Sequence, residues 1–223
     1  MQPLQRYKQD LAHVLWLGGT PCSGKTSIAR RLVDLYPLQL YHYDRRERVH
    51  LALSRAERHP FMRADGDMTM DQRWVLRSVD VMVQATTAAW EERFEMVVDD
   101  LLALPRTPPV LAEGPGLLPG CVAPLLTGAG QAIWLVPTEA FKRATQPLRG
   151  GAPAIETSDP ELAYRNLIAL DLQLAADVKG RAEELGLTVL EVDGSRSVDA
   201  MAAIVADHFG PLLRGAGRGG AAR

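Results

Sequence analysis

The sequence predicts an α/β fold: a three-layer α/β/α sandwich around a five-stranded parallel sheet. Two observations lead to it. Short apolar runs of strand length alternate along the chain with longer stretches in which apolar residues recur at helical spacing. The short runs are apolar almost throughout, which is typical of parallel strands covered on both faces. This alternation implies right-handed crossovers with helices on both sides of the sheet.

The individual elements follow from the same patterns. Strands are expected over residues 13–18, 38–43, 109–113, 131–136 and 187–192. Helices are expected over residues 27–36, 70–104, 159–185 and 197–209. Thr86 and Thr87 are the expected bend of the long 70–104 helix. Asp159 and Pro160 form a start signal for the next helix, because Asp can cap and Pro suits the first turn, and Gly186 forms its stop signal.

Length and composition limit the classes of protein to which this chain can belong. The chain has 223 residues, enough for one domain with its own core. It carries 25 Lys+Arg against 27 Asp+Glu, a net charge of −2, which argues against a general nucleic-acid-binding surface. Two cysteines cannot form a disulfide framework. The apolar runs are shorter than the roughly 18 residues of a membrane span, and the N-terminus has no apolar signal-peptide core.

We therefore expect one domain over residues 1–211, followed by a flexible Gly/Ala/Arg-rich tail over 212–223. We also expect a cytoplasmic protein without nucleic-acid or membrane partners. Composition and patterning carry no prediction of the oligomeric state.

The sharpest motif lies between the first expected strand and the first expected helix. The stretch GTPCSGKT fits G-x-x-x-x-G-K-[ST] at every defined position. Its glycines let backbone N–H groups wrap a polyphosphate, and the helix N-terminus adds the positive end of its dipole. Lys25 is expected to reach the β- and γ-phosphates and the Thr26 hydroxyl to ligate Mg²⁺. The expected nucleotide-binding residues are Gly19, Thr20, Pro21, Cys22, Ser23, Gly24, Lys25, Thr26 and Ser27. Cys22 is expected to be a small buried side chain rather than a nucleophile.

With its flanks, the stretch GGTPCSGKTSIARRL resembles the opening of P-loop kinases of the nucleotide and small-molecule kinase group. That group includes adenylate, shikimate and gluconate kinases and chloramphenicol phosphotransferase. The resemblance covers most of the chain by layout and is specific only at the motif. It implies a P-loop NTPase fold, ATP with Mg²⁺, and transfer of the γ-phosphoryl group to a small-molecule acceptor. The acidic second motif of ATPase motors is missing, and this disfavours a motor.

Two carboxylates take roles from this resemblance. In this kinase group an Asp at the end of the second strand orients or deprotonates the acceptor hydroxyl, or helps to hold Mg²⁺, and Asp44 matches it. Glu113 ends the third expected strand and resembles the acidic residue that holds a Mg²⁺-bound water or the substrate. With Thr26, these two residues form the expected metal set. Gly114 and Gly116 would let the backbone approach a ligand. As alternatives, Asp44 caps the next helix and Glu113 is incidental to a turn.

Three nearby side chains are expected to have structural roles instead. Strand alternation turns His42 away from the face that Asp44 uses, so that it packs or is exposed. Trp74 and Trp90 lie on the apolar side of the long helix and are expected in the core.

The resemblance also assigns roles to two long segments. Residues 45–104 correspond to a helical insertion that binds the acceptor. Its arginines would suit an anionic acceptor, or they are charged helix surface. Residues 139–160 correspond to a short lid whose arginines close on the transferring phosphate. The candidate catalytic arginines are Arg143, Arg149 and, on the next helix, Arg165; a solvated surface role is the alternative for each.

The loop after the last strand resembles the one that cradles the nucleobase in the same group. Gly194, Ser195 and Arg196 are the candidates there. The alternative is a turn in which Ser195 or Ser197 caps the following helix.

The expected function is an ATP- and Mg²⁺-dependent phosphotransferase acting on a small-molecule hydroxyl. Lys25, Asp44 and Glu113 would be catalytic together with the lid arginines. One alternative is a nucleoside monophosphate kinase, whose acceptor is a phosphate. Another is a nucleotide-binding regulatory module or NTP hydrolase without an acceptor, which the arginine-bearing insertion disfavours.

Overall fold

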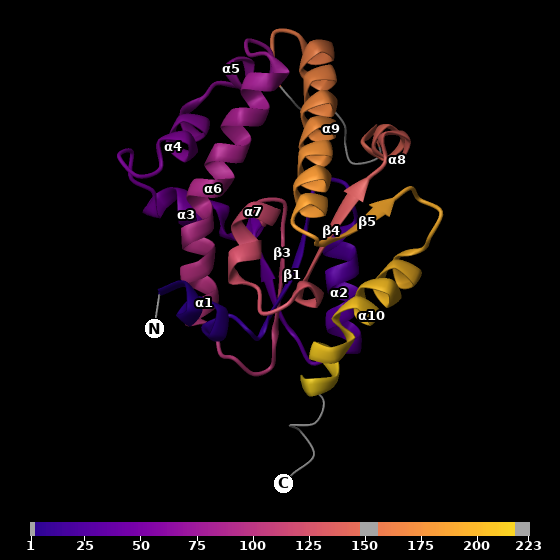
Figure 1. Cartoon of the computed structure of the whole chain (residues 1–223). Helices are drawn as coiled ribbons and strands as arrows, with labels where there is room; N and C mark the ends of the chain where they lie inside the picture. Colours follow the sequence, from indigo (N-terminus) through magenta and orange to yellow (C-terminus); the bar gives the residue numbers. More distant parts are fainter. Residues whose placement is uncertain (1–2, 148–155, 217–223) are drawn as a thin grey trace.

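A computed structural model of the chain describes residues 3–147 and 156–216. Its centre is a five-stranded, all-parallel sheet with the strand order β2-β3-β1-β4-β5 (Figure 1). The strands are β1 (Val14–Gly19), β2 (Gln39–His42), β3 (Val110–Glu113), β4 (Ala132–Pro137) and β5 (Thr188–Val192). Each lies within one residue of its expected bounds. The prediction of an α/β fold with a five-stranded parallel sheet is therefore confirmed.

Helices connect the strands and cover both faces of the sheet. They are α1 (Pro3–Asp10), α2 (Lys25–Leu35), η1 (Asp44–Arg46), α3 (Glu47–Leu53), α4 (Pro60–Asp67), α5 (Met70–Trp74), α6 (Val79–Ala103), α7 (Pro119–Val122), η2 (Ala123–Leu125), η3 (Ala129–Gln131), α8 (Glu139–Thr145), α9 (Pro160–Glu184) and α10 (Val198–Ala216). In Figure 1, α3 to α6 form a helical group at one side of the molecule, next to α9.

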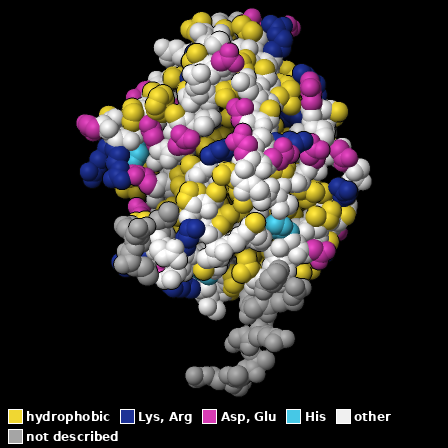
Figure 2. All heavy atoms as spheres, in the orientation of Figure 1, with side chains coloured by type: hydrophobic (Ala, Val, Ile, Leu, Met, Phe, Trp, Pro, Cys, Tyr) yellow, Lys and Arg dark blue, Asp and Glu magenta, His cyan; other side chains and the backbone are white. Residues whose placement is uncertain are grey.

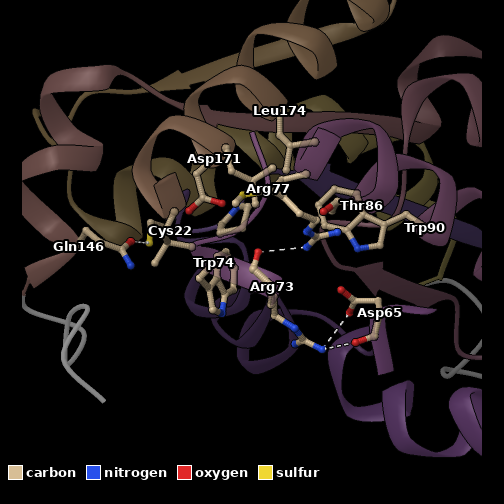
Figure 3. Close-up of a pocket in the computed structure, with 14 residues that line it drawn as sticks. Cys22, Asp65, Arg73, Trp74, Arg77, Thr86, Trp90, Gln146, Asp171 and Leu174 are labelled. Atoms are coloured by element: carbon tan, nitrogen blue, oxygen red, sulfur yellow. Dashed lines mark hydrogen bonds and ion pairs between the residues drawn. The ribbon is translucent and has the colours of Figure 1, made fainter. Parts of the chain in front are cut away.

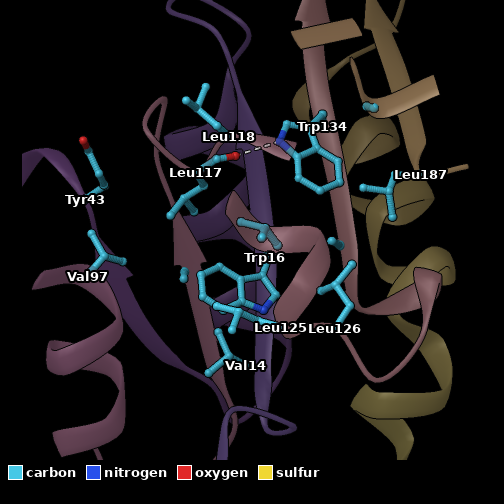
Figure 4. Close-up of a cluster of buried hydrophobic side chains, with 14 of the residues drawn as sticks. Val14, Trp16, Tyr43, Val97, Leu117, Leu118, Leu125, Leu126, Trp134 and Leu187 are labelled. Atoms are coloured by element: carbon cyan, nitrogen blue, oxygen red, sulfur yellow. Dashed lines mark hydrogen bonds between the residues drawn. The ribbon is translucent and has the colours of Figure 1, made fainter. Parts of the chain in front are cut away.

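Alternation along the buried strands divides the core in two. On one face, Leu15 and Leu17 of β1 pack with side chains of α2 and α10, such as Ile28. On the other face, Trp16 and Trp134 belong to a cluster with side chains of α6, α7 and α9. Figure 4 shows the two rings with Leu117, Leu118 and Leu125 of the same cluster. Each face of the sheet is thus buried under helices, an arrangement compatible with the expected three-layer sandwich.

The long helix expected over 70–104 is interrupted, but not where the sequence suggested. The helix is not interrupted at Thr86 and Thr87, where a bend was predicted, because both residues lie inside the continuous α6. The break comes earlier, between α5 and α6, where the Ser78 hydroxyl accepts a hydrogen bond from the N–H of Val81 and caps α6. Apolar spacing runs on across Ser78 and conceals the cap.

The predicted ends of α9 are confirmed, whereas the predicted end of the last helix is wrong. Asp159 caps α9 by accepting a hydrogen bond from the N–H of Leu162 (2.9 Å), and Gly186 follows the helix with a φ of 66°, as expected. The last helix is longer than predicted. It continues through 212–216, which the sequence assigned to a flexible tail, because Leu213 is buried in the core of the α2 and α10 face. Residues 217–223 lie outside the described residues.

The surface mixes charges of both signs on the face seen in Figure 2. Within residues 3–147 and 156–216, no helix is long and apolar enough to cross a bilayer.

Candidate functional site

Residues 19–26, called the glycine loop below, connect the central strand β1 to α2. β1 lies between β3 and β4, so the loop leaves the middle of the carboxyl edge of the sheet, where open α/β sheets bind ligands. Gly19 has a φ of 126°, and a Cβ at this position would lie 2.0 Å from the carbonyl oxygen of Leu135. Both conformation and crowding therefore require glycine there. Cys22 and Gly24 also have positive φ, at 68° and 80°, which curls the loop tightly.

The loop gathers hydrogen-bond donors. Gly24 is the N-cap of α2 and gives no side-chain cap, which leaves the positive end of an 11-residue helix directed at the loop. Lys25, 7% exposed, donates from Nζ to the carbonyl of Thr20 (2.8 Å) and to Ser23 Oγ (3.3 Å). The hydroxyl of Thr20 is buried with no hydrogen-bond partner in the described part of the chain. A buried orphaned hydroxyl and a buried ammonium fit a loop that binds an anion with several oxygens.

Glu113 lies beside the glycine loop, as the sequence predicted. β3 lies between β1 and β2, and Glu113 is in register with Leu17 on one side and His42 on the other. The Thr26 hydroxyl is 3.2 Å from each carboxylate oxygen of Glu113, and His42 Nδ1 lies 2.7 Å from Oε1. Glu113 is only 3% exposed, so this contact holds a buried carboxylate at the first turn of α2.

His42 was expected to point away from the face that Asp44 uses and to be packed or exposed. Its side chain is packed, at 11% exposed, and it packs against Glu113 of this site. β2 ends at His42, and Asp44 belongs to η1. Strand alternation therefore does not relate the two side chains. His42 instead shares a face of the sheet with its cross-strand neighbour Glu113.

Asp44 begins η1 just beyond the end of β2. The N-cap of η1 is Tyr43, so the alternative in which Asp44 caps this helix is wrong. Although the Asp44 residue is exposed, its pKa is raised above the ordinary value, first by desolvation within the site and next by the negative charge of Glu113. The charge of Lys25 opposes this rise. Asp44, Glu113 and Lys25 therefore act on one another electrostatically at the carboxyl edge.

Gly114 and Gly116 have a different role from the one expected. A Cβ on either residue would lie 2.1 or 2.2 Å from atoms of the Tyr43 side chain. These glycines make room for the buried Tyr43 ring, over which the guanidinium of Arg93 lies 3.8 Å from the centroid. The expectation that they admit a ligand is therefore wrong; they fix the chain that carries Asp44.

Asp100 of α6 anchors the same segment from behind. Its carboxylate accepts hydrogen bonds from Tyr41 (2.9 Å) and from Arg46 (both 2.8 Å), and it lies 2.8 Å from Nε2 of His50. Arg46 ends η1 and His50 belongs to α3. One carboxylate therefore ties β2, η1 and α3 to α6, next to Asp44.

We expect Asp100→Asn to lower the free energy of unfolding at neutral pH. The variant should also lose less of this stability than the wild type when the pH is lowered. Burial raises the pKa of Asp100, but the hydrogen bonds from Arg46, His50 and Tyr41 outweigh it and hold that pKa below its ordinary value. The folded protein therefore gains stability above the unfolded pKa of about 4 and loses it as pH falls through the folded pKa. Urea unfolding at pH 7 and pH 3 measures both effects, with about 1–3 kcal/mol expected at pH 7. Asp99→Asn, at an exposed neighbour, is the control; equal behaviour of both variants would contradict the anchor.

The described part of the lid-like segment is the short helix α8. Arg143 on it is exposed and pairs with Glu139 at 2.8 Å. Arg149 lies outside the described residues, and Arg165 is exposed on α9. The structure therefore places Arg143 and Arg165 on the surface and does not bring them together with the carboxylates.

The neighbouring Lys142 is the residue of α8 that meets the glycine loop. It is fully buried, forms an ion pair with Asp171 of α9 and lies 3.2 Å from Cys22 Sγ. Cys22 is buried, as expected, and its thiol donates to Gln146 Oε1 (3.0 Å). Burial raises the pKa of Asp171, and the charges of Lys142 and then Lys25 oppose that rise. Sequence reasoning missed this pair, because a lysine on a short helix normally predicts a surface position.

The loop after β5 contains a turn followed by a cap. Asp193 Oδ1 accepts hydrogen bonds from the N–H (2.9 Å) and the hydroxyl (2.6 Å) of Ser195. Ser197 caps α10 by accepting from Ala200 N, which confirms the capping alternative for that residue. Gly194, with a φ of 84°, lies against Phe141 of α8, where a Cβ would be 2.7 Å from the ring. Ser195 and Arg196 are exposed.

A cavity of about 430 Å³ opens next to the glycine loop. It lies between Pro21 and Cys22 of the loop, α9, and the helices α4, α5 and α6 (Figure 3). Trp74 and Trp90, expected in the core, are partly buried and pack on a core cluster, and both also line this cavity. A second cavity of about 330 Å³ continues beyond Asp65 and Arg73, which line both. Such volumes are typical of small-molecule sites.

Oxygen donors for a divalent cation are present at the edge of the sheet in Thr26 and Glu113. Among the described residues, no group of three or more His, Cys, Asp or Glu side chains could hold a metal ion. In nucleotide-dependent enzymes, Mg²⁺ commonly takes only one or two protein oxygens and completes its shell with phosphates and water. Thr26 and Glu113 fit that kind of site.

Comparison with known proteins gives the fold little context. No family model matches the chain, and no curated protein matches it. Among the solved structures that match is an uncharacterized protein from Eubacterium ventriosum ATCC 27560, at 10% identity and a TM-score of 0.42. That match covers 89% of this chain and 98% of the other.

Proposed function

We propose that this protein is an ATP- and Mg²⁺-dependent phosphotransferase of the P-loop kinase type, which transfers the γ-phosphoryl group of ATP to a hydroxyl of a small molecule. The observation that carries the proposal is the glycine loop at the carboxyl end of the central strand. There the uncapped start of α2, buried Lys25 and the Thr26–Glu113 contact converge. The strand order and the cavity beside the loop are consistent with this class.

The residues divide the work by chemistry. Backbone N–H groups of the glycine loop bind the phosphates, and the Lys25 ammonium neutralises charge on the transferring group. Thr26 and Glu113 would hold Mg²⁺ directly or through water, and the ion would neutralise negative charge on the phosphates. We also propose that Gly194, Ser195 and Arg196, in the loop after β5, bind the nucleobase of ATP.

Asp44 positions the acceptor. Its carboxylate accepts the proton of the acceptor hydroxyl while the hydroxyl oxygen bonds to the γ-phosphorus. The bond from that phosphorus to the β,γ-bridging oxygen breaks, and ADP leaves with the bond's electron pair. An environment that raises the pKa of Asp44 makes it a better proton acceptor. We expect the protein to act in the cytoplasm, where ATP is available.

The proposal is tested by ATP turnover with and without acceptors. A panel of small alcohols and nucleoside monophosphates is offered with Mg²⁺ and ATP, and the products are resolved by phosphorus NMR. Phosphorylation of an alcohol is the expected result. Transfer to a nucleoside monophosphate would replace it with the nucleotide-kinase alternative. ADP and inorganic phosphate with every acceptor would indicate a hydrolase.

Asp44→Asn is expected to lower kcat about 100- to 10,000-fold, the usual contribution of a general base, while ATP binding stays near that of the wild type. Because the pKa of Asp44 is raised, the acid limb of the wild-type pH–kcat profile should lie above the ordinary aspartate value. Activity should fall as pH drops through that limb, since protonated Asp44 cannot accept the proton. Asp177→Asn, at an exposed position in α9 that is not among the charges acting on Asp44, is the control. An unchanged kcat and acid limb in Asp44→Asn would exclude the base role.

A further inference from the structure

Arg93 of α6 carries a buried charge whose contacts are all uncharged. The residue is 6% exposed, and it forms no ion pair among residues 3–147 and 156–216. Its guanidinium contacts a histidine, a carbonyl oxygen and an aromatic ring instead. A buried charge without a counter-charge costs free energy. A role other than an ordinary ion pair therefore has to explain why an arginine lies there.

His50 of α3 holds one end of this guanidinium. Arg93 Nε lies 3.0 Å from Nδ1 of His50, and because an arginine nitrogen can only donate, Nδ1 is the acceptor. The ring proton is then on Nε2, which donates to Asp100 at 2.8 Å. Burial also lowers the pKa of His50, so the ring is neutral at pH 7. His50 therefore orients the guanidinium without adding a second charge.

The other end of the guanidinium holds the peptide that leads into Asp44. Nη2 of Arg93 donates to the carbonyl oxygen of Tyr43 at 2.5 Å, and the same guanidinium lies over the Tyr43 ring. The N–H of Tyr43 donates to the carbonyl oxygen of Glu113 at 3.0 Å. The Tyr43 carbonyl and the Asp44 nitrogen belong to one planar peptide group. Arg93 therefore fixes the plane from which η1 and the Asp44 side chain begin.

The charge of Arg93 also acts on the Asp44 carboxyl. Desolvation and then the charge of Glu113 raise the pKa of Asp44, and the charges of Lys25 and Arg93 oppose that rise. Lys25 belongs to the glycine loop, where the proposed function assigns it to the phosphates. Arg93 approaches from α6 and belongs to no phosphate-binding element. Its effect on Asp44 is thus independent of the effect of the loop.

We infer that Arg93 is a positioning residue for Asp44: it holds the Tyr43–Asp44 peptide through the Tyr43 carbonyl oxygen and is itself oriented by His50. This inference deepens the proposed function and rests on it, because Asp44 is the proton acceptor proposed there. Arg93 acts through the Asp44 carboxylate and touches neither ATP nor the acceptor. A misplacement of about 1 Å in a reacting group can cost about 100-fold in rate, so the hold on this peptide affects catalysis.

The test is a double-substitution cycle on the full-length protein. The first substitution is Arg93→Met, because methionine is flexible and apolar and packs well on an aromatic ring such as that of Tyr43. The second is Asp44→Asn, which removes the proposed proton acceptor. Release of ADP from ATP and Mg²⁺ is measured with water alone and with glycerol at molar concentration. Both probes have to lose a proton, so both need the Asp44 carboxylate in place.

Arg93→Met should lower kcat about 10- to 100-fold in the wild-type background and leave KM for ATP unchanged. In the Asp44→Asn background the same substitution should lower kcat less than about threefold, because residues that act as one unit are not additive. A merely structural role would give the same loss in both backgrounds. Arg93→Lys keeps the charge and a donor, so it should retain more of kcat than Arg93→Met.

Arg181→Met is the matched control, because Arg181 is an exposed arginine of α9 that pairs with Glu184. It should change kcat in neither background. Circular dichroism and ATP affinity, measured for each variant, show whether Arg93→Met folds. If it unfolds, Arg93→Lys takes its place in the cycle, with a smaller loss expected in the wild-type background and none in the Asp44→Asn background.

The inference is overturned if the folded Arg93 variant keeps the wild-type kcat. It is also overturned if the loss is equally large in the Asp44→Asn background, since Arg93 would then act on the phosphates or the acceptor directly, or only on the fold. Either result leaves ATP binding and turnover by the wild type intact. A wild type that neither binds ATP nor turns it over would instead contradict the proposed function, and this inference with it, so the two failures are distinguishable.

Discussion

Replacing Lys25 with alanine is expected to lower ATP turnover about 100- to 1,000-fold, the usual loss when a preorganised charge or donor on a transition state is removed. The Lys25 ammonium is buried in the glycine loop, 2.8 Å from the carbonyl oxygen of Thr20. In this position it would meet the transferring phosphoryl group without reorganising at the moment of reaction. Steady-state release of ADP, measured with saturating acceptor, gives the size of the effect.

The control for this experiment is Lys179→Ala, which removes a surface ammonium paired with Glu191. It should leave turnover unchanged. Thermal melting of both variants separates catalytic loss from unfolding, since Lys25 also hydrogen-bonds within its own loop. Full turnover in a folded Lys25→Ala protein would refute the proposed role of the loop.

Asp171→Ala is expected to destabilise the protein by about 3–5 kcal/mol, because it leaves the Lys142 ammonium buried without its counter-charge. Lys142 is 0% exposed and Asp171 is 6% exposed, so water can replace the lost carboxylate only by opening the structure. Urea unfolding at neutral pH measures the loss. The glycine loop should loosen as well, since Lys142 also contacts Cys22.

A second substitution distinguishes an unpaired charge from a lost contact. Adding Lys142→Met to Asp171→Ala removes the buried charge and should recover much of the lost stability, because apolar residues can replace a buried ion pair. Glu191→Ala, which breaks the exposed pair with Lys179, should change the unfolding midpoint little. If Asp171→Ala is as mild as Glu191→Ala, the buried pair contributes no more than a surface one.

The sequence predicted a feature correctly where the physical cause of that feature lies within the same short stretch of chain. The inner strands β1, β3 and β4 were predictable because burial on both faces makes them largely apolar, and β1 shows this along its whole length. The glycine loop was predictable because its backbone demands positive φ at Gly24 and tight packing at Gly19. Asp159 marked the start of α9 because capping is a contact across three residues.

Contacts between segments far apart in the chain could not be predicted from the local sequence. Gly114 and Gly116 are forced by the ring of Tyr43, which lies just beyond the end of β2. Nothing in the sequence around the two glycines distinguishes this from an approach by a ligand. His42 reaches Glu113 only because β2 and β3 are adjacent and in register. Strand order follows from the packing of the whole chain, so it lies outside any window of local pattern.

By itself, then, the sequence determined the parallel α/β sheet, the position of the glycine loop and the expectation of a phosphate-binding chemistry, because backbone conformation and burial leave marks on neighbouring residues. Only the tertiary structure decided which charges meet. It buried Lys142 against Asp171, placed Glu113 on Thr26 and held the guanidinium of Arg93 against the carbonyl oxygen of Tyr43. Electrostatic partnership depends on distance in space and on the exclusion of water, and a folded chain sets both.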